Sequence, residues 1–412
     1  MIKVKVHYTV REVILVVLFY LLLLQDVFVE QIPLLGYVDE GVAVLGAAIL
    51  LFKLIAKENI VLKKSEIILF GGILVFVAAG AFSNVIYQYQ QLLPVLKDIF
   101  TCLKFFLAIV VGMELIRSIE IEQSANILVW NSKLVAAALF VMLLMNILFG
   151  MFATNEERYG LPIVQLMFSH PTILAATAVF LLGILTLFYK RENNIFIIFS
   201  LVVLFFTLRS KAIAAVAVYL FMFLRVVWMR KKIGFVHLLL IAIIAVCLAW
   251  DQIYYYYFHL SDESARAMLT QTSFKILKDF FPLGTGFGTF ASNVAAESYS
   301  QVYFEYGLDI VYGLRENNAK FASDTFWPIV IGQTGFIGTC GYVVAMIVII
   351  LRVMRTRKNS NAAYMAGMFI FGYLLISSTS ESAFCNPMAI PLALVLGGVL
   401  GLERNYRYRD NE

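Results

Sequence analysis

The sequence predicts an all-α protein that crosses a membrane many times, and two observations support this. First, 61% of the 412 residues are hydrophobic and only 14% are charged, whereas soluble domains are about half apolar and about a quarter charged. Second, apolar stretches of about 17 to 25 residues recur along the chain, each long enough to cross a hydrocarbon core of about 30 Å as a helix. A soluble globular fold is therefore excluded.

We expect about twelve transmembrane helices of this kind. They cover residues 13–29, 38–56, 66–84, 99–116, 130–152, 171–189, 194–208, 212–229, 234–251, 328–351, 361–379 and 384–402. The first stretch is expected to be retained rather than cleaved as a signal peptide, because no small-residue cleavage site follows it and another span begins soon after.

The distribution of basic residues predicts the orientation. Lys and Arg gather in alternate connections, such as Arg230–Lys232 and Arg352–Lys358, and such connections face the cytoplasm. Both termini are therefore expected in the cytoplasm. The chain then divides into nine spans over residues 1–251, a long extracytoplasmic loop over 252–324, and three spans with a short basic tail over 325–412.

Two classes of site are not expected. The net charge of +5 reflects the basic cytoplasmic connections, so we expect no nucleic-acid partner. The four cysteines lie in or beside apolar helices without a CxxC pair or a neighbouring His, so we expect no zinc site.

The sequence from Leu208 to Lys211 places two cations on the outer side, where basic residues are otherwise avoided. The stretch from Ile195 to Leu208 has about 14 residues and covers only about 21 Å of the hydrocarbon core, so the turn after it is recessed. A cation inside a membrane costs about 2.5–3.5 kcal/mol. Arg209 and Lys211 therefore predict an outward-facing anion site, or alternatively they extend to lipid phosphates.

The long loop contains an expected amphipathic helix and a glycine-rich turn. Apolar residues recur at helical spacing in Ala265–Phe280, and Arg266 at its start either binds an anion or is solvated. The turn Gly284–Thr289 has the GxGxG spacing of a nucleotide loop, but it follows Pro282 and lacks the strand-to-helix context. We expect it to turn the chain back toward the membrane.

Aromatic and acidic side chains complete the candidate site. Tyr299, Tyr303 and Tyr306 offer aromatic faces suited to sugar rings, or pack the loop onto the membrane surface. Asp324 precedes a span at a depth where low dielectric raises a carboxyl pKa and suits a general base; alternatively it caps the tenth helix. His170, at the outer start of the sixth span, is a further candidate for substrate binding.

Three segments together resemble the O-antigen polymerase and O-antigen ligase family of membrane glycosyltransferases. LRSKA is similar to the family's short Arg-Ser turn, SARAMLTQTSFKILKDFFPLGTGFGTF resembles its Arg-containing segment and glycine-rich turn, and SDTFWPIVIGQTGFIG resembles the helix start that closes its large loop. Ligases typically have His and Asn where this chain has Asp324 and Thr325, which favours a polymerase. The resemblance implies the GT-C type of architecture.

The implied reaction moves a glycan from a polyprenyl-diphosphate donor to a hydroxyl of a second lipid-linked unit, at the outer face of the membrane. Arg209, Lys211 and Arg266 would bind the diphosphate and stabilise its developing charge, and Asp324 would take the proton of the hydroxyl. Because fixed cations replace a metal, we expect no metal or other cofactor and activity that resists EDTA. The expected partners are the lipid-linked donor and acceptor and the bilayer, with a chain-length regulator and a flippase as candidate protein partners.

Two alternatives stay open. A ligase would transfer the finished glycan to a lipid or protein acceptor. A flippase or another secondary transporter of lipid-linked oligosaccharides would also need about twelve spans and cations in a cavity, but such transporters usually have two matching halves with broken helices. In this chain the long loop occurs once.

Overall fold

The computed structural model describes residues 10–56, 63–117 and 121–409, with short gaps. The gaps are residues 153, 155, 232, 234–236, 238–242, 244–249, 251–253 and 255–263. The protein is 73% helix with almost no strand. Within these described residues, six helical segments are long and apolar enough to cross a membrane, which makes this an all-α membrane protein, as predicted. They are Pro33–Lys53, Lys64–Tyr87, Leu92–Ile116, Ala125–Phe149, Ser210–Trp228 and Trp327–Thr356.

Helices cover each predicted span except 234–251, which lies almost wholly outside the described residues. The first half contains α1 (Val10–Phe28), the 3-10 helix η1 (Pro33–Tyr37), α2 (Val38–Ile55), α3 (Lys64–Tyr87), α4 (Leu92–Arg117), α5 (Ile121–Phe149), the strands β1 (Glu157–Arg158) and β2 (Leu161–Pro162), and α6 (Pro171–Leu187). After η2 (Arg191–Asn193) follow α7 (Asn194–Phe206), α8 (Ser210–Met222), the π-helical η3 (Phe223–Trp228), α10 (Ala265–Asp279), α11 (Asn293–Glu297), α12 (Gln301–Glu305), α13 (Trp327–Thr356), α14 (Asn361–Ser377) and α15 (Ala389–Arg409). The count of about twelve spans and the orientation stay predictions.

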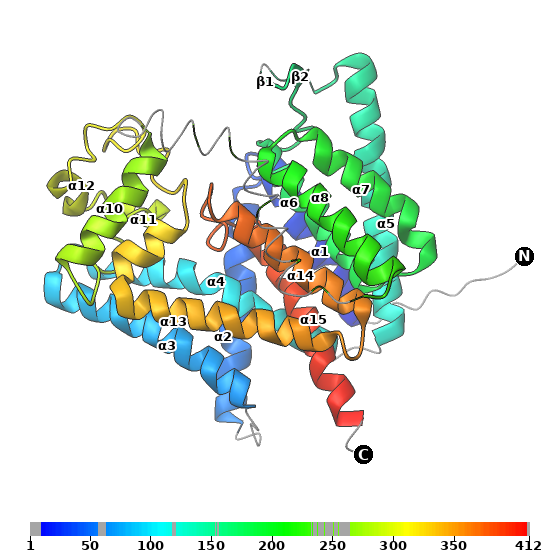
Figure 1. The fold of residues 1–412 in the computed structure, drawn as a ribbon, viewed down its shortest axis with the longest axis horizontal. Coiled ribbons are helices and arrows are strands. Elements are labelled where there is room, and N and C mark those ends of the chain that lie inside the picture. Colours follow the sequence, from blue (N-terminus) through cyan, green and yellow to red (C-terminus); the bar gives the residue numbers. More distant parts are fainter. Residues whose placement is uncertain are drawn as a thin grey trace, which may run out of the picture.

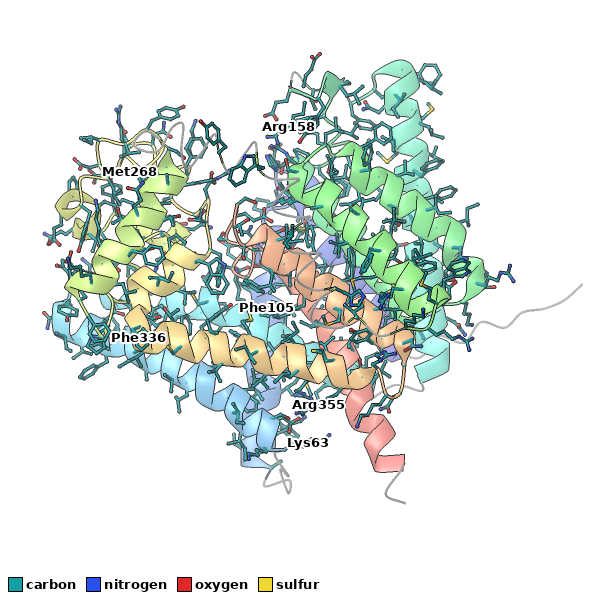
Figure 2. The ribbon with its side chains drawn as sticks, in the orientation of Figure 1. Lys63, Phe105, Arg158, Met268, Phe336 and Arg355 are labelled. Carbon is teal, nitrogen blue, oxygen red and sulfur yellow. The ribbon has the colours of Figure 1, made fainter. Side chains whose placement is uncertain are left out.

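The helices form two groups joined by α14 and α15. In one group α13 packs along α3 and α4 lies between α2 and α15, while in the other α5, α6, α7 and α8 pack together (Figure 1). The long loop folds into α10, α11 and α12 at one end of α13 (Figure 1). Arg158 and Met268 lie at one end of the molecule, and Lys63 and Arg355 at the opposite end (Figure 2).

Glycines bring α3 and α13 into backbone contact. A Cβ atom on Gly72 would lie 2.6 Å from the carbonyl oxygen of Gly341, and a Cβ on Gly341 would lie 2.6 Å from that of Gly72. Small residues at such crossings allow dispersion contacts between backbones, the main attraction between helices in lipid. The same occurs where Gly112 of α4 meets the carbonyl of Leu394 in α15.

A break in α13 receives the glycine-rich turn of the long loop. Gly335 has φ 61° and ψ −157°, so the carbonyls before it lose their helical partners. Thr285 N donates to the Gly332 carbonyl at 3.0 Å, and Gly286 N donates to the Gln333 carbonyl at 2.9 Å. The turn thus restores hydrogen bonds that the broken helix lacks, which ties the loop to α13 and agrees with the structural role expected for it.

The crossing of α3 and α13 provides a first prediction. Gly72→Ala should destabilise the protein by about 1–3 kcal/mol, because the new methyl group overpacks a tight contact. Gly71→Ala is the matched control, since a Cβ at position 71 would meet nothing within 4 Å. Thermal unfolding of both variants in detergent measures the difference, and equal melting temperatures would contradict the close contact.

Candidate functional site

A cavity of about 370 Å³ opens among the connections between helices; we call it the cationic cavity. It is lined by Arg158, His170, Thr172, Arg209, Ser210, Lys211, Arg266, Phe321, Ser323, Asp324, Ser380, Glu381, Ser382 and Asn386. These residues come from β1, the start of α6, the turn between α7 and α8, the start of α10, the segment before α13 and the connection between α14 and α15. Five of the predicted site residues, scattered over the sequence, therefore line one cavity.

The turn that carries Arg209 is short and set by its flanking helices. Helix α7 ends after 13 residues, about 20 Å of rise, which is less than a hydrocarbon core of about 30 Å; that the turn is recessed in the membrane stays a prediction. Leu208 adopts φ 50°, which reverses the chain, and Arg209 then precedes α8 in an extended conformation. Lys211 follows in the first turn of α8 and is buried.

Acidic and imidazole groups surround the two cations of this turn. Lys211 Nζ lies 2.6 Å from Glu381 Oε2, which comes from the connection between α14 and α15. Arg209 donates to His170 Nε2 at 3.0 Å and contacts the exposed Glu156 carboxylate at 3.4 Å. The anion site expected from Arg209 and Lys211 thus contains carboxylates of the protein itself.

Arg266 and Asp324 meet at the loop side of the cavity. Arg266 lies in the first turn of α10, the helix expected there, and donates from Nη2 to Asp324 Oδ2 at 3.1 Å. Helix α13 has Phe326 at its N-cap and no side-chain cap, so the alternative that Asp324 caps this helix is wrong. Burial raises the pKa of Asp324, while the charge of Arg266 opposes that shift.

His170 is fixed by the start of α6. Its Nδ1 lies 2.6 Å from Thr172 Oγ1, and Pro171 occupies the first helical position, where a missing N–H costs nothing. Burial and the charges of Arg209 and Lys211 lower the pKa of His170. The imidazole is therefore neutral at neutral pH and accepts a hydrogen bond from Arg209 through Nε2.

The charge of the cavity favours an anion. Among the described residues that line it, Arg158, Arg209, Lys211 and Arg266 are cationic, whereas Asp324 and Glu381 are anionic. The excess of positive charge lies in a partly buried site, where Coulomb attraction is stronger than in water. A ligand with more than one negative charge and several acceptor oxygens fits this arrangement.

The three tyrosines proposed for sugar binding lie outside this cavity. Tyr303 is fully buried and stacks on Tyr299 with ring centroids 4.9 Å apart. The Tyr299 hydroxyl donates to the carbonyl of Leu314 at 2.7 Å, and the Tyr306 hydroxyl donates to Asp279 at 2.8 Å. Burial raises the pKa of Tyr299 to about 12. The contacts of the three tyrosines hold the long loop together.

Sequence reasoning missed Arg158 and the polar segment between α14 and α15. That segment supplies Glu381 to Lys211, and its Ser382 hydroxyl donates to Asn386 Oδ1 at 2.7 Å. Glu381 could have been found from the sequence, because a buried Lys211 needs a nearby anion. The short polar run Ser377–Glu381, at the end of a predicted span, contains one. Which connection supplies the acid depends on how α14 packs on α8.

Comparison of this chain with known proteins finds no match. No protein-family model, no curated protein and no solved structure matches this chain. The geometry of the cationic cavity and the sequence segments around it therefore carry the functional argument.

The cavity predicts binding of inorganic diphosphate to the purified protein. Arg209→Ala and Arg266→Ala should each weaken it at least about tenfold, since a hydrogen bond to a charged group contributes about 1.5–3 kcal/mol. Lys278→Ala is the matched control, because Lys278 is an exposed cation on α10 outside the cavity. Calorimetric titration at low salt measures the affinities, and equal affinity in all three variants would contradict the assignment.

Proposed function

We propose that this protein is a membrane glycosyltransferase that joins polyprenyl-diphosphate-linked glycan units at the outer face of the bacterial cytoplasmic membrane. The observation that carries the proposal is the convergence of Arg209, Lys211, Arg266 and Asp324 on one cavity. A lipid-linked diphosphate requires clustered cations beside an apolar phase, and the transfer requires a base. Both requirements have candidates within the same cavity.

The donor diphosphate would lie among the cations. Arg209 reaches the cavity from the turn between α7 and α8 and Arg266 from the start of α10, so two separate elements present guanidinium groups to a ligand. Two guanidinium groups offer fixed, planar sets of donors that suit phosphate oxygens. Lys211 adds a point charge from the first turn of α8.

The transfer step exchanges one carbon–oxygen bond for another. The acceptor hydroxyl oxygen bonds to the anomeric carbon of the donor sugar as the bond from that carbon to the phosphate oxygen breaks. The electron pair leaves with the diphosphate, where Arg209, Lys211 and Arg266 stabilise the charge. The hydroxyl proton passes to Asp324, whose raised pKa suits it as a general base.

The acceptor is the second part of the proposal. We infer that it is another lipid-linked unit, so that the reaction lengthens a surface polysaccharide, because the family resemblance at Asp324–Thr325 favours a polymerase over a ligase. The transporter alternative is less well supported by the cavity, because its lining residues all come from helix ends and connections. A carrier needs a site that both sides of the membrane reach in turn.

The role of Asp324 predicts a specific kinetic defect. Asp324→Asn should lower kcat by about 10²–10⁴-fold, the usual contribution of a general base, while diphosphate affinity is unchanged or higher because Arg266 loses a competing carboxylate. Glu316→Gln, an exposed acid of the same loop, is the control. Gel analysis of surface glycan distinguishes the reactions: a single-repeat product indicates a polymerase, and unattached long chains indicate a ligase.

The pH profile provides a second test of the same group. A base must be deprotonated, so activity should fall as pH drops through the pKa of Asp324. Because burial raises that pKa, the acidic limb should lie above the value of about 3.9 for an exposed Asp. The limb should persist in Asp324→Glu and vanish from the residual activity of Asp324→Asn. An unchanged limb in Asp324→Asn would assign the base to another residue.

A further inference from the structure

A second cavity adjoins the cationic cavity; we call it the adjoining groove. It has a volume of about 350 Å³ and lies between α1, η1, α6, α14 and α15. Four residues line both spaces: His170, Thr172, Glu381 and Asn386. A ligand anchored by its phosphates among the cations can therefore extend directly into the groove.

The lining of the groove is mixed in character. Apolar side chains such as Ile173, Leu374 and Leu392 form one part of its wall, and Gln25 and Asp26 of α1 form another. Asp26 is already engaged, since it accepts from Ser169 N at 2.9 Å and from Ser169 Oγ at 2.7 Å. Its pair with Ser169 holds α1 against the segment before α6.

Gln25 stands out on this wall. The residue is only 5% exposed, and within the described part of the chain neither its amide oxygen nor its amide nitrogen has a hydrogen-bond partner. Buried polar groups almost always have such a partner. An amide on the wall of a groove obtains one from a ligand that carries both donors and acceptors.

We propose that the adjoining groove binds the sugar next to the diphosphate of the donor, with Gln25 as a specificity-determining residue. This inference rests on the proposed function and adds which part of the substrate lies there. A sugar has C–H faces for the apolar wall and hydroxyl groups for the Gln25 amide. A lipid chain would leave the amide unsatisfied, which is why the groove is assigned to the glycan.

The test compares two probes on the full-length protein in lipid nanodiscs. One is polyprenyl diphosphate without a sugar, and the other is the lipid-linked glycan that accumulates in cells lacking this protein. Gln25→Leu should weaken binding of the glycan-bearing probe about tenfold and leave binding of the bare probe unchanged. Gln31→Leu is the matched control, because Gln31 is exposed and lies outside the groove.

A groove-filling variant separates sugar from lipid chain. Ala176→Phe places a ring into the groove from α6 and should weaken binding of the glycan-bearing probe alone. Equal weakening of both probes would identify the groove as a lipid-chain site and overturn the inference, as would unchanged binding in both variants. Gln25→Leu nearly preserves the side-chain volume, so this variant should fold. If Ala176→Phe does not fold, Gln25→Leu alone tests whether the groove binds the sugar.

Failure of the proposed function gives a different result. Arg209→Ala should weaken binding of both probes, because the diphosphate is common to them. If Arg209→Ala alters neither, or if no lipid-linked glycan accumulates in cells lacking the protein, the proposed function itself is wrong. Loss of glycan preference in Gln25→Leu with intact sensitivity to Arg209→Ala supports both proposals.

Discussion

The arrangement of the cavity depends on the cost of burying cations at the turn between α7 and α8. Arg209 and Lys211 follow a helix of 13 residues, and charges withdrawn from water require compensation by partners. Compensation comes from two separate connections: Glu156 and His170 lie between α5 and α6, and Glu381 lies between α14 and α15. The need to neutralise two side chains therefore draws together segments that are far apart in sequence, and the cationic cavity forms where they meet.

The loop side of the cavity depends on a backbone constraint rather than on charge. Gly335 interrupts α13, and the main-chain donors of Thr285 and Gly286 bind the carbonyls freed by that break. The long loop is thus attached to α13 within the first two turns of this helix. Because Arg266 precedes the attachment point in sequence and Asp324 follows it, both return to the same edge of the cavity, where they pair at 3.1 Å.

A site residue could be predicted from the sequence where it is unusual among its sequence neighbours. Arg209 and Lys211 were predictable because a cation between two apolar stretches needs a reason, whatever the tertiary structure. Glu381 was not, because an acid in a short polar connection is ordinary and its pairing with Lys211 depends on the packing of α14 against α8. Gln25 could not be predicted either, since one neutral amide barely changes the hydropathy of a span. The helices themselves followed from hydrophobic length, whereas the break at Gly335 and its occupation by the glycine-rich turn are tertiary features.

The ion pairs inside the cavity give the proposed reaction an order of events. Asp324 contacts Arg266 at 3.1 Å and Glu381 contacts Lys211 at 2.6 Å, so each carboxylate occupies a cation that the diphosphate would also bind. Phosphate oxygens of a bound donor would compete for Arg266, and Asp324 would then lose the partner that opposes the rise of its pKa. A carboxylate released in this way would be a stronger base while the donor is in place. Donor binding and activation of the base would then be one event, which would restrict transfer to the occupied site.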